Sequence, residues 1–151
     1  MKLQGKKILL VEDDNFIGDM FIRKLKAEGA MCSRAVNGID GINKLKEAEF
    51  DFDIIITDVM MAGMDGYEMV QAINKLEEAH AIPIVVLTNR TSLNSVNSKI
   101  VDLNIEKLFI KSNTDLIALI DELETILNNI NPKPQKNAES TTPILGPITP
   151  E

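Results

Sequence analysis

The stretch DFDIIITDVMMAGMDGYE, residues 51–68, contains a strand, an acid directly behind it, a turn and the beginning of a helix. Its run Phe52–Thr57 is β-rich and apolar on both faces, which indicates a buried strand of a parallel sheet rather than a half-exposed antiparallel strand. Asp58 follows this run, and Asp65-Gly66 is typical of a turn that enters a helix. The stretch therefore predicts a buried parallel strand that leads to a carboxylate and then to a helix.

Further strand and helix patterns alternate on both sides of this stretch. The other four strands are expected at Lys6–Val11, Met31–Ala35, Ile84–Thr88 and Glu106–Ile110. Apolar stripes with helical spacing predict five helices, over Phe16–Leu25, Ile39–Leu45, Tyr67–Leu76, Leu93–Ile100 and Leu116–Ile126. Five strand-then-helix units predict an α/β fold, in which right-handed crossovers place helices on both faces of a parallel sheet.

Polar side chains stand at the carboxyl ends of four predicted strands. Glu12 and Asp13 follow the first strand, and Asp58 follows the third. Thr88 ends the fourth strand, and Lys111 follows the fifth. Each residue by itself is an ordinary loop or surface residue, whereas chance rarely produces the whole set. Because ligands of a doubly wound sheet bind beyond the carboxyl ends of its strands, the pattern predicts one site at this edge.

The residue types at these strand ends indicate phosphoryl chemistry with a metal ion. Carboxylates that share one crevice repel each other, and a hard divalent cation such as Mg²⁺, which takes oxygen ligands, removes that repulsion. Asp58 would then be a nucleophile that forms an aspartyl-phosphate, while the cation neutralises charge on the transferred oxygens. Thr88 would offer a hydroxyl group and Lys111 a cation to the phosphoryl oxygens.

With these residues the chain resembles the response-regulator receiver (CheY-like) family, single-domain type, over roughly residues 5–130. The resemblance rests on ILLVEDD (residues 8–14), DIIITDVMMAGMDGYE (53–68), PIVVLT (83–88) and FIKS (109–112). It implies a flavodoxin-like, doubly wound, five-stranded parallel sheet of order 2-1-3-4-5 with five helices. In that order the reversal lies between the first and third strands, so Glu12, Asp13 and Asp58 are expected to meet there.

The resemblance also implies a phosphorylation switch of a two-component phosphorelay rather than an enzyme. A histidine kinase or phosphotransfer protein would present phosphohistidine, and Asp58 would accept the phosphoryl group and lose it by slow self-catalysed hydrolysis. The implied ligands of Mg²⁺ are Glu12, Asp13, Asp58 and the backbone carbonyl of Met60. Thr88 and Lys111 would contact the phosphoryl oxygens and shift the fourth helix, fifth strand and fifth helix, whose surface would bind a downstream protein.

Several positions depart from the family pattern. Ala62 and Ser112 stand where prolines are usual, so the loop after Asp58 is expected to be looser, and the step after Lys111 lacks the residue that makes a cis peptide inexpensive. Leu108 occupies the usual place of an aromatic switch residue. Phe109 comes one position later and should face the other side of its strand. These departures motivate an alternative, an adaptor of receiver fold that acts without phosphorylation.

Two other classes of function are disfavoured by residues at the predicted site. Mg²⁺-dependent phosphatases with an Asp nucleophile commonly carry a second Asp two residues later, where this chain has Met60. Flavin-binding proteins of the same fold need a phosphate-cradling loop after the first strand, and Glu12-Asp13-Asp14 would repel phosphate there. Asp14 is expected to open the first helix rather than to bind metal.

Composition limits the partners and the organisation of the chain. A net charge of -7, a pI of about 4.8 and the lack of Trp disfavour direct nucleic-acid binding. The single Cys32 fits a reducing, cytoplasmic setting, and the apolar run Ile8–Val11 is too short for a signal peptide or a membrane span. Five of the six prolines lie in 131–151, which predicts a receiver domain over 1–130 and a disordered, Pro-rich tail over 131–151.

Overall fold

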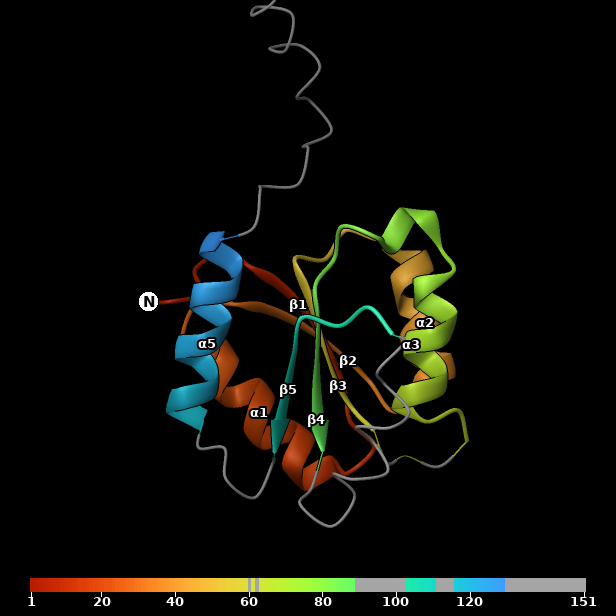
Figure 1. Ribbon diagram of the computed structural model, residues 1–151. Helices are drawn as coiled ribbons and strands as arrows, with labels where there is room; N and C mark the ends of the chain where they lie inside the picture. Colours follow the sequence, from red (N-terminus) through yellow and green to blue (C-terminus); the bar gives the residue numbers. More distant parts are fainter. Residues whose placement is uncertain (60, 62, 89–102, 111–115, 130–151) are drawn as a thin grey trace, which may run out of the picture.

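The computed structural model describes residues 1–59, 61, 63–88, 103–110 and 116–129. Within these residues, five parallel strands form one sheet in the order β2-β1-β3-β4-β5 (Figure 1). The strands are β1 (Lys7–Val11), β2 (Met31–Ala35), β3 (Ile54–Asp58), β4 (Ile84–Thr88) and β5 (Lys107–Ile110). The flavodoxin-like order 2-1-3-4-5 is confirmed, and the order reverses between β1 and β3, which are neighbours.

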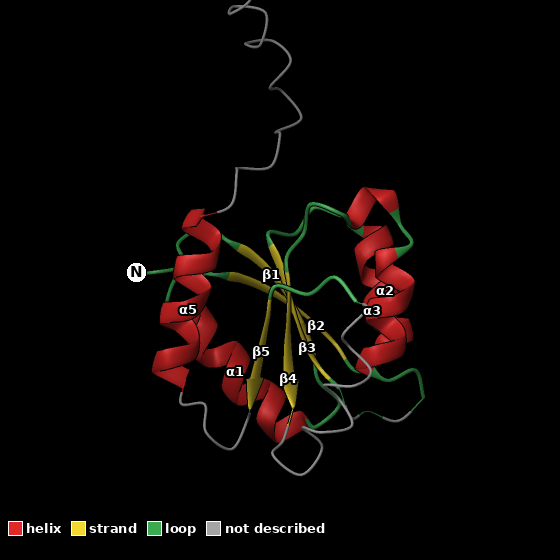
Figure 2. Ribbon diagram, in the orientation of Figure 1, coloured by secondary structure: helices red, strands yellow, loops and turns green. Residues whose placement is uncertain are grey.

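Helices cover both faces of the sheet, as the alternation of patterns predicts. One face carries α1 (Asn15–Ala27) and α5 (Leu116–Asn129), and the other carries α2 (Gly38–Glu47) and α3 (Gly66–Asn74) (Figure 2). A 3-10 turn, η1 (Glu77–Ala79), follows α3. The fourth helix predicted over Leu93–Ile100 and the tail predicted over 131–151 lie outside the described residues. In the described part of the chain, no helix combines the length and the apolar character that a bilayer span requires.

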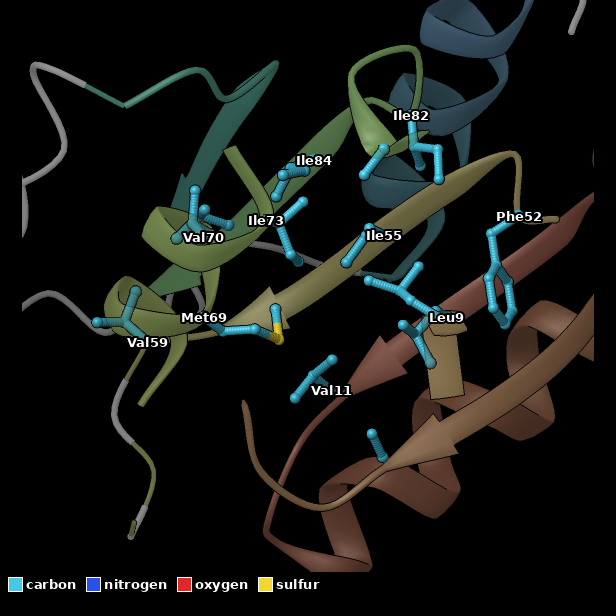
Figure 3. Close-up of a cluster of buried hydrophobic side chains, with 14 of the residues drawn as sticks. Leu9, Val11, Phe52, Ile55, Val59, Met69, Val70, Ile73, Ile82 and Ile84 are labelled. Carbon is cyan, nitrogen blue, oxygen red and sulfur yellow. The ribbon is translucent and has the colours of Figure 1, made fainter. Parts of the chain in front are cut away.

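Alternate residues of each strand divide the core into two clusters. Leu9 and Ile55 point toward α2 and α3, where Met69 and Ile73 meet them in what we call the α2/α3 cluster (Figure 3). The intervening strand residues, such as Leu10, face the opposite helices in the α1/α5 cluster. Every residue of β3 and of β4 is buried. The interior strands β3 and β4 are buried because helices cover both faces of the sheet.

The third strand is displaced from its predicted range. The sequence pattern predicts a strand at Phe52–Thr57, whereas the strand runs from Ile54 to Asp58. Phe52 is buried in the α2/α3 cluster ahead of the strand, and Asp58 pairs with Leu87 of β4. Asp58 is therefore the last residue of a strand rather than the first residue of a loop. This difference matters for the site, because the sheet itself holds the Asp58 backbone.

Polar side chains begin three helices at the carboxyl edge of the sheet. Asp14 and Asn37 each accept a hydrogen bond at 2.9 Å from the backbone N–H three residues later. Asp65 forms a capping box with Glu68, with hydrogen bonds of 2.8 and 3.1 Å. These bonds satisfy N–H groups that a first helical turn leaves without an intrahelical partner. The helix-start role of Asp14 and the helix entry at Asp65-Gly66 are confirmed.

Candidate functional site

Three carboxylates meet at the carboxyl edge of the sheet, where the strand order reverses. Glu12 and Asp13 follow β1, and Asp58 ends the neighbouring strand β3. Each of the three offers one carboxylate oxygen, and these oxygens lie within 4.8 Å of one another. Glu12 and Asp58 are 1% and 6% exposed, whereas Asp13 is exposed. The structure therefore brings together the three acids that the strand-end pattern predicted to meet.

This donor set suits a hard divalent cation. Two of the three carboxylates are buried, and buried charges of like sign are poorly screened by water and salt. Carboxylate oxygens are the ligands that Mg²⁺ prefers, and it usually binds through one or two of them while keeping several waters. The combination of buried and exposed carboxylates fits a cation that is held by the protein on one side and hydrated on the other.

Hydrogen bonds with β2, and one within the segment itself, hold the residues that carry the acid pair. The N–H of Glu12 donates to the carbonyl of Ala35, the last residue of β2, at 3.0 Å. The Oε2 atom of Glu12 accepts from the N–H of Asp14 at 3.2 Å. Arg34 of β2 donates to the carbonyl of Glu12 at 2.8 Å. No sequence pattern points to Arg34, because its role depends on its place beside Gly18 of α1 rather than on a local motif.

Contacts with β4 and with the start of α3 hold the backbone around Asp58. Asp58 pairs with Leu87 of β4, and the hydroxyl group of Thr57 donates to the Asp58 carbonyl at 2.9 Å. Gly66, the first residue of α3, donates its N–H to the carbonyl of Val59 at 3.0 Å. It also lies against the carbonyl oxygen of Asp58 so closely that a Cβ would overlap it. Gly66 thus allows α3 to begin directly against the phosphoacceptor candidate.

The remaining predicted site residues have different outcomes. Thr88 is the last residue of β4, is fully buried and comes directly after Leu87, the strand partner of Asp58. Thr88 therefore lies at the same edge of the sheet as the three acids. Lys111 and the carbonyl of Met60 lie outside the part of the chain that the structure describes.

The residues at the expected switch position face opposite sides of β5. Leu108 packs against the α2/α3 cluster, and Phe109 packs against the α1/α5 cluster. The ammonium group of Lys107 lies 5.9 Å from the centroid of the Phe109 ring, within the range of a cation–π contact. The predicted orientation of Phe109, away from the side of Leu108, is confirmed.

Known proteins resemble the chain in sequence and in fold. The family model described as response regulator receiver domain matches residues 8–124. The uncharacterized transcriptional regulatory protein YbdJ of Bacillus subtilis (strain 168) is 36% identical over 93 residues, which are 62% of this chain and 39% of that protein. The transcriptional activator protein IrlR of Burkholderia pseudomallei (strain 1026b) is 32% identical over 122 residues, which are 80% of this chain and 50% of that protein.

A solved structure of similar fold is that of the Vibrio cholerae chemotaxis protein CheY4. It is 27% identical to this chain, and the superposition has a TM-score of 0.72. It covers 81% of this chain and 98% of the chemotaxis protein. The chain thus spans half or less of the length of the two regulatory proteins, and nearly all of the length of CheY4.

Proposed function

The chain belongs to the response regulator receiver domain family, and we propose that Asp58 is its phosphoacceptor. Receiver domains are signalling switches rather than classical enzymes. One observation carries the assignment of Asp58: it is a buried strand-end carboxylate whose oxygen lies within 4.8 Å of carboxylate oxygens of Glu12 and Asp13. In this arrangement, a metal ion bound by the three carboxylates would lie next to the carboxylate that acts as the nucleophile.

The proposed Mg²⁺ ligands are Glu12, Asp13, Asp58 and the backbone carbonyl of Met60. When bound, Mg²⁺ supplies positive charge that offsets the negative charge developing on the transferred phosphoryl oxygens. Glu12 and Asp13 contribute oxygens from a segment that hydrogen bonds with β2 already hold in place, so little reorganisation is needed on binding. The burial of Glu12 supports this role, because charges interact more strongly away from water.

In the proposed reaction, a carboxylate oxygen of Asp58 attacks the phosphorus atom of a phosphohistidine on a histidine kinase or phosphotransfer protein. An O–P bond forms while the N–P bond breaks, and the imidazole nitrogen keeps the bonding electron pair and takes up a proton. The Thr88 hydroxyl group and the Lys111 ammonium group would bind the phosphoryl oxygens. Slow attack by water on the aspartyl-phosphate would then regenerate the carboxylate and release phosphate.

We further propose that phosphorylation changes a surface that includes β5, α5 and the fourth helix predicted from the sequence, and that a downstream protein binds in response to this change. Direct contact with nucleic acid is disfavoured by the net charge of -7. A cytoplasmic location is supported by the single Cys32, because one cysteine forms no disulfide within the chain.

Substitution of Asp58 by Asn tests the proposal. Wild-type and variant chains are incubated with Mg²⁺ and a small phosphodonor such as acetyl phosphate, and phosphoryl incorporation is measured by intact-protein mass spectrometry. The wild type should gain one phosphoryl group, whereas Asp58→Asn should gain none, because an amide is not a competent nucleophile. A chelator should abolish incorporation by the wild type.

Asp51 provides a matched control, since it is an exposed acid at the opposite end of β3. Asp51→Asn should be phosphorylated as the wild type is. Undiminished incorporation by Asp58→Asn would refute the assignment of Asp58. A wild-type chain that accepts no phosphoryl group and does not respond to a phosphoryl analogue would favour the adaptor alternative.

A further inference from the structure

Arg34 extends from the edge strand β2 to the loop that carries the acid pair. Its side chain is 19% exposed and lies on the α1 side of the sheet, like Leu10, its partner in the strand register. The Nε and Nη2 atoms donate to the carbonyl of Glu12 at 3.2 and 2.8 Å, and Nη2 also donates to the carbonyl of Asp14 at 3.2 Å. These two carbonyls lie immediately before and after Asp13 in the chain. The guanidinium group therefore holds the backbone on both sides of that acid.

Gly18 of α1 provides the space for this guanidinium group. A Cβ at position 18 would lie 2.5 Å from both Cζ and Nε of Arg34, which is closer than Cβ atoms approach other atoms. Glycine weakens a helix interior relative to alanine, and Gly18 is buried within α1. The passage of Arg34 explains why this helix position has no side chain. The neighbouring Asp19 carboxylate, 3.7 Å from Nη1, lies beside the same group.

We infer that Arg34 is a positioning residue for metal binding, which it supports by fixing the backbone of Glu12 and Asp13. The inference rests on the proposed function, because it concerns the same Mg²⁺ site. The hydrogen bonds from Arg34 to this segment end on carbonyl oxygens, so the arginine orients the acids without competing with a cation for their carboxylates. Nε and Nη2 of the planar guanidinium fork donate together to the Glu12 carbonyl while Nη2 also reaches the Asp14 carbonyl, and the single nitrogen of a lysine ammonium group cannot reproduce that paired contact.

The first experiment measures Mg²⁺ affinity directly, by isothermal titration calorimetry of the full chain with magnesium chloride and no phosphodonor. Arg34→Ala should weaken binding by about 10- to 100-fold, the usual effect of removing a group that orients metal ligands. Arg34→Lys should recover only part of this loss. Arg23→Ala is the matched control, because Arg23 is an exposed arginine of α1 whose removal changes the net charge equally. It should bind Mg²⁺ as the wild type does.

The second experiment displaces the guanidinium group without changing Arg34. Gly18→Ala should lower Mg²⁺ affinity toward that of Arg34→Ala, because the new methyl group occupies the space of Cζ and Nε. In the Arg34→Ala background, the same Gly18→Ala change should cause no further loss of affinity and should raise the midpoint of thermal unfolding, since alanine favours the helix. A residue that only stabilised the fold would not give this pattern.

Each outcome separates this inference from the proposed function. Wild-type Mg²⁺ affinity in a folded Arg34→Ala or Gly18→Ala chain would overturn the role of Arg34 and leave the proposed function standing. Additive losses of affinity in the double variant would also overturn it, because the two residues would then act independently. If Arg34→Ala does not fold, Gly18→Ala and Arg34→Lys decide the question. A wild-type chain that binds no Mg²⁺ would instead refute the proposed metal site.

Discussion

At Gly66, the first turn of α3 touches the carbonyl oxygen of Asp58, and no side chain fits between them. A Cβ at this position would also approach Cα of Val59 to 2.9 Å. The contact is between backbone atoms, which cannot turn away as the end of a long side chain can. The position of α3 relative to Asp58 therefore depends on a residue that has no side chain.

Gly66→Ala should destabilise the protein by about 1–3 kcal/mol, the usual cost of forcing an extra carbon into a packed site. This loss is expected although alanine is the better helix former. Because either α3 or the loop after Asp58 must move, phosphoryl incorporation at Asp58 should also slow. Urea unfolding gives the stability change, and the time course of incorporation gives the second effect.

Gly63 offers the matched control in the same loop. Nothing lies within 4 Å of a Cβ at position 63, and its φ of 78° lies in the left-handed region that asparagine tolerates. Gly63→Asn should therefore change both stability and incorporation much less than Gly66→Ala. Equal effects of the two substitutions would show that backbone conformation, and not the contact with Asp58, limits this loop.

At the scale of elements, the start of α2 links the second strand to the loop after Asp58. Asn37 caps the helix, and the next residue, Gly38, donates its N–H to the carbonyl of Met64 at 2.9 Å. Met64 in turn packs over Gly38 and against the α2/α3 cluster. One helix end thus supports the loop of another strand through backbone contacts.

Removal of the cap at Asn37 tests how much this helix start contributes. Asn37→Ala should lower the free energy of unfolding by about 1 kcal/mol, because it deprives the N–H of Asp40 of its side-chain acceptor. Asn37→Asp keeps an acceptor oxygen and should retain most of the stability. Chemical denaturation of the three chains measures the difference. A loss in Asn37→Asp as large as that in Asn37→Ala would point to a role of the amide group other than capping.

Elements were easier to predict than their relations. Alternating patterns located the strands to within about two residues, and residue type alone indicated the helix starts at Asp14 and Asp65. The strand order came from the family resemblance, because periodicity shows which residues are buried but not which strands are neighbours. The last residue of β3 was misplaced, since its pairing with Leu87 depends on a strand far along the chain.

The site shows the same division between local and non-local information. Glu12, Asp13 and Asp58 were found because strand ends are visible in a sequence, and a parallel sheet gathers such ends at one edge. Arg34 was not found, since its role depends on where α1 crosses β2 and on the absence of a side chain at Gly18. Residues that hold the backbone of a site from another element have no local pattern.

At the scale of the whole molecule, stability comes from two apolar layers that share one sheet. Ile55 of β3 is fully buried in the α2/α3 cluster, between β1 and β4 (Figure 3). Ile55→Ala should lower the free energy of unfolding by about 2–5 kcal/mol, through lost burial and the cavity left behind. Asp58 ends the same strand. Phosphoryl acceptance should therefore be lost at the denaturant concentration at which this layer unfolds.

An isoleucine at the surface provides the comparison. Ile117 of α5 is 65% exposed, so Ile117→Ala should change the free energy of unfolding by no more than about 0.5 kcal/mol. Urea titration followed by circular dichroism measures both variants, with incorporation assayed across the same series. If the chain still accepted a phosphoryl group after the circular dichroism signal of the folded state is lost, the site would not depend on the global fold.

The contact between Gly18 and Arg34 also constrains the paths by which this sequence can evolve. On the inference above, an alanine at position 18 lowers Mg²⁺ affinity while the arginine is present; once the arginine is lost, the same alanine favours the helix. The sign of one mutation's fitness effect thus depends on the other residue, which is sign epistasis. A lineage that loses the arginine and then acquires the alanine would not recover the metal-binding role of the arginine by regaining it in one step. Descendants would differ at both positions together, and the order of their changes would be readable from reconstructed ancestors.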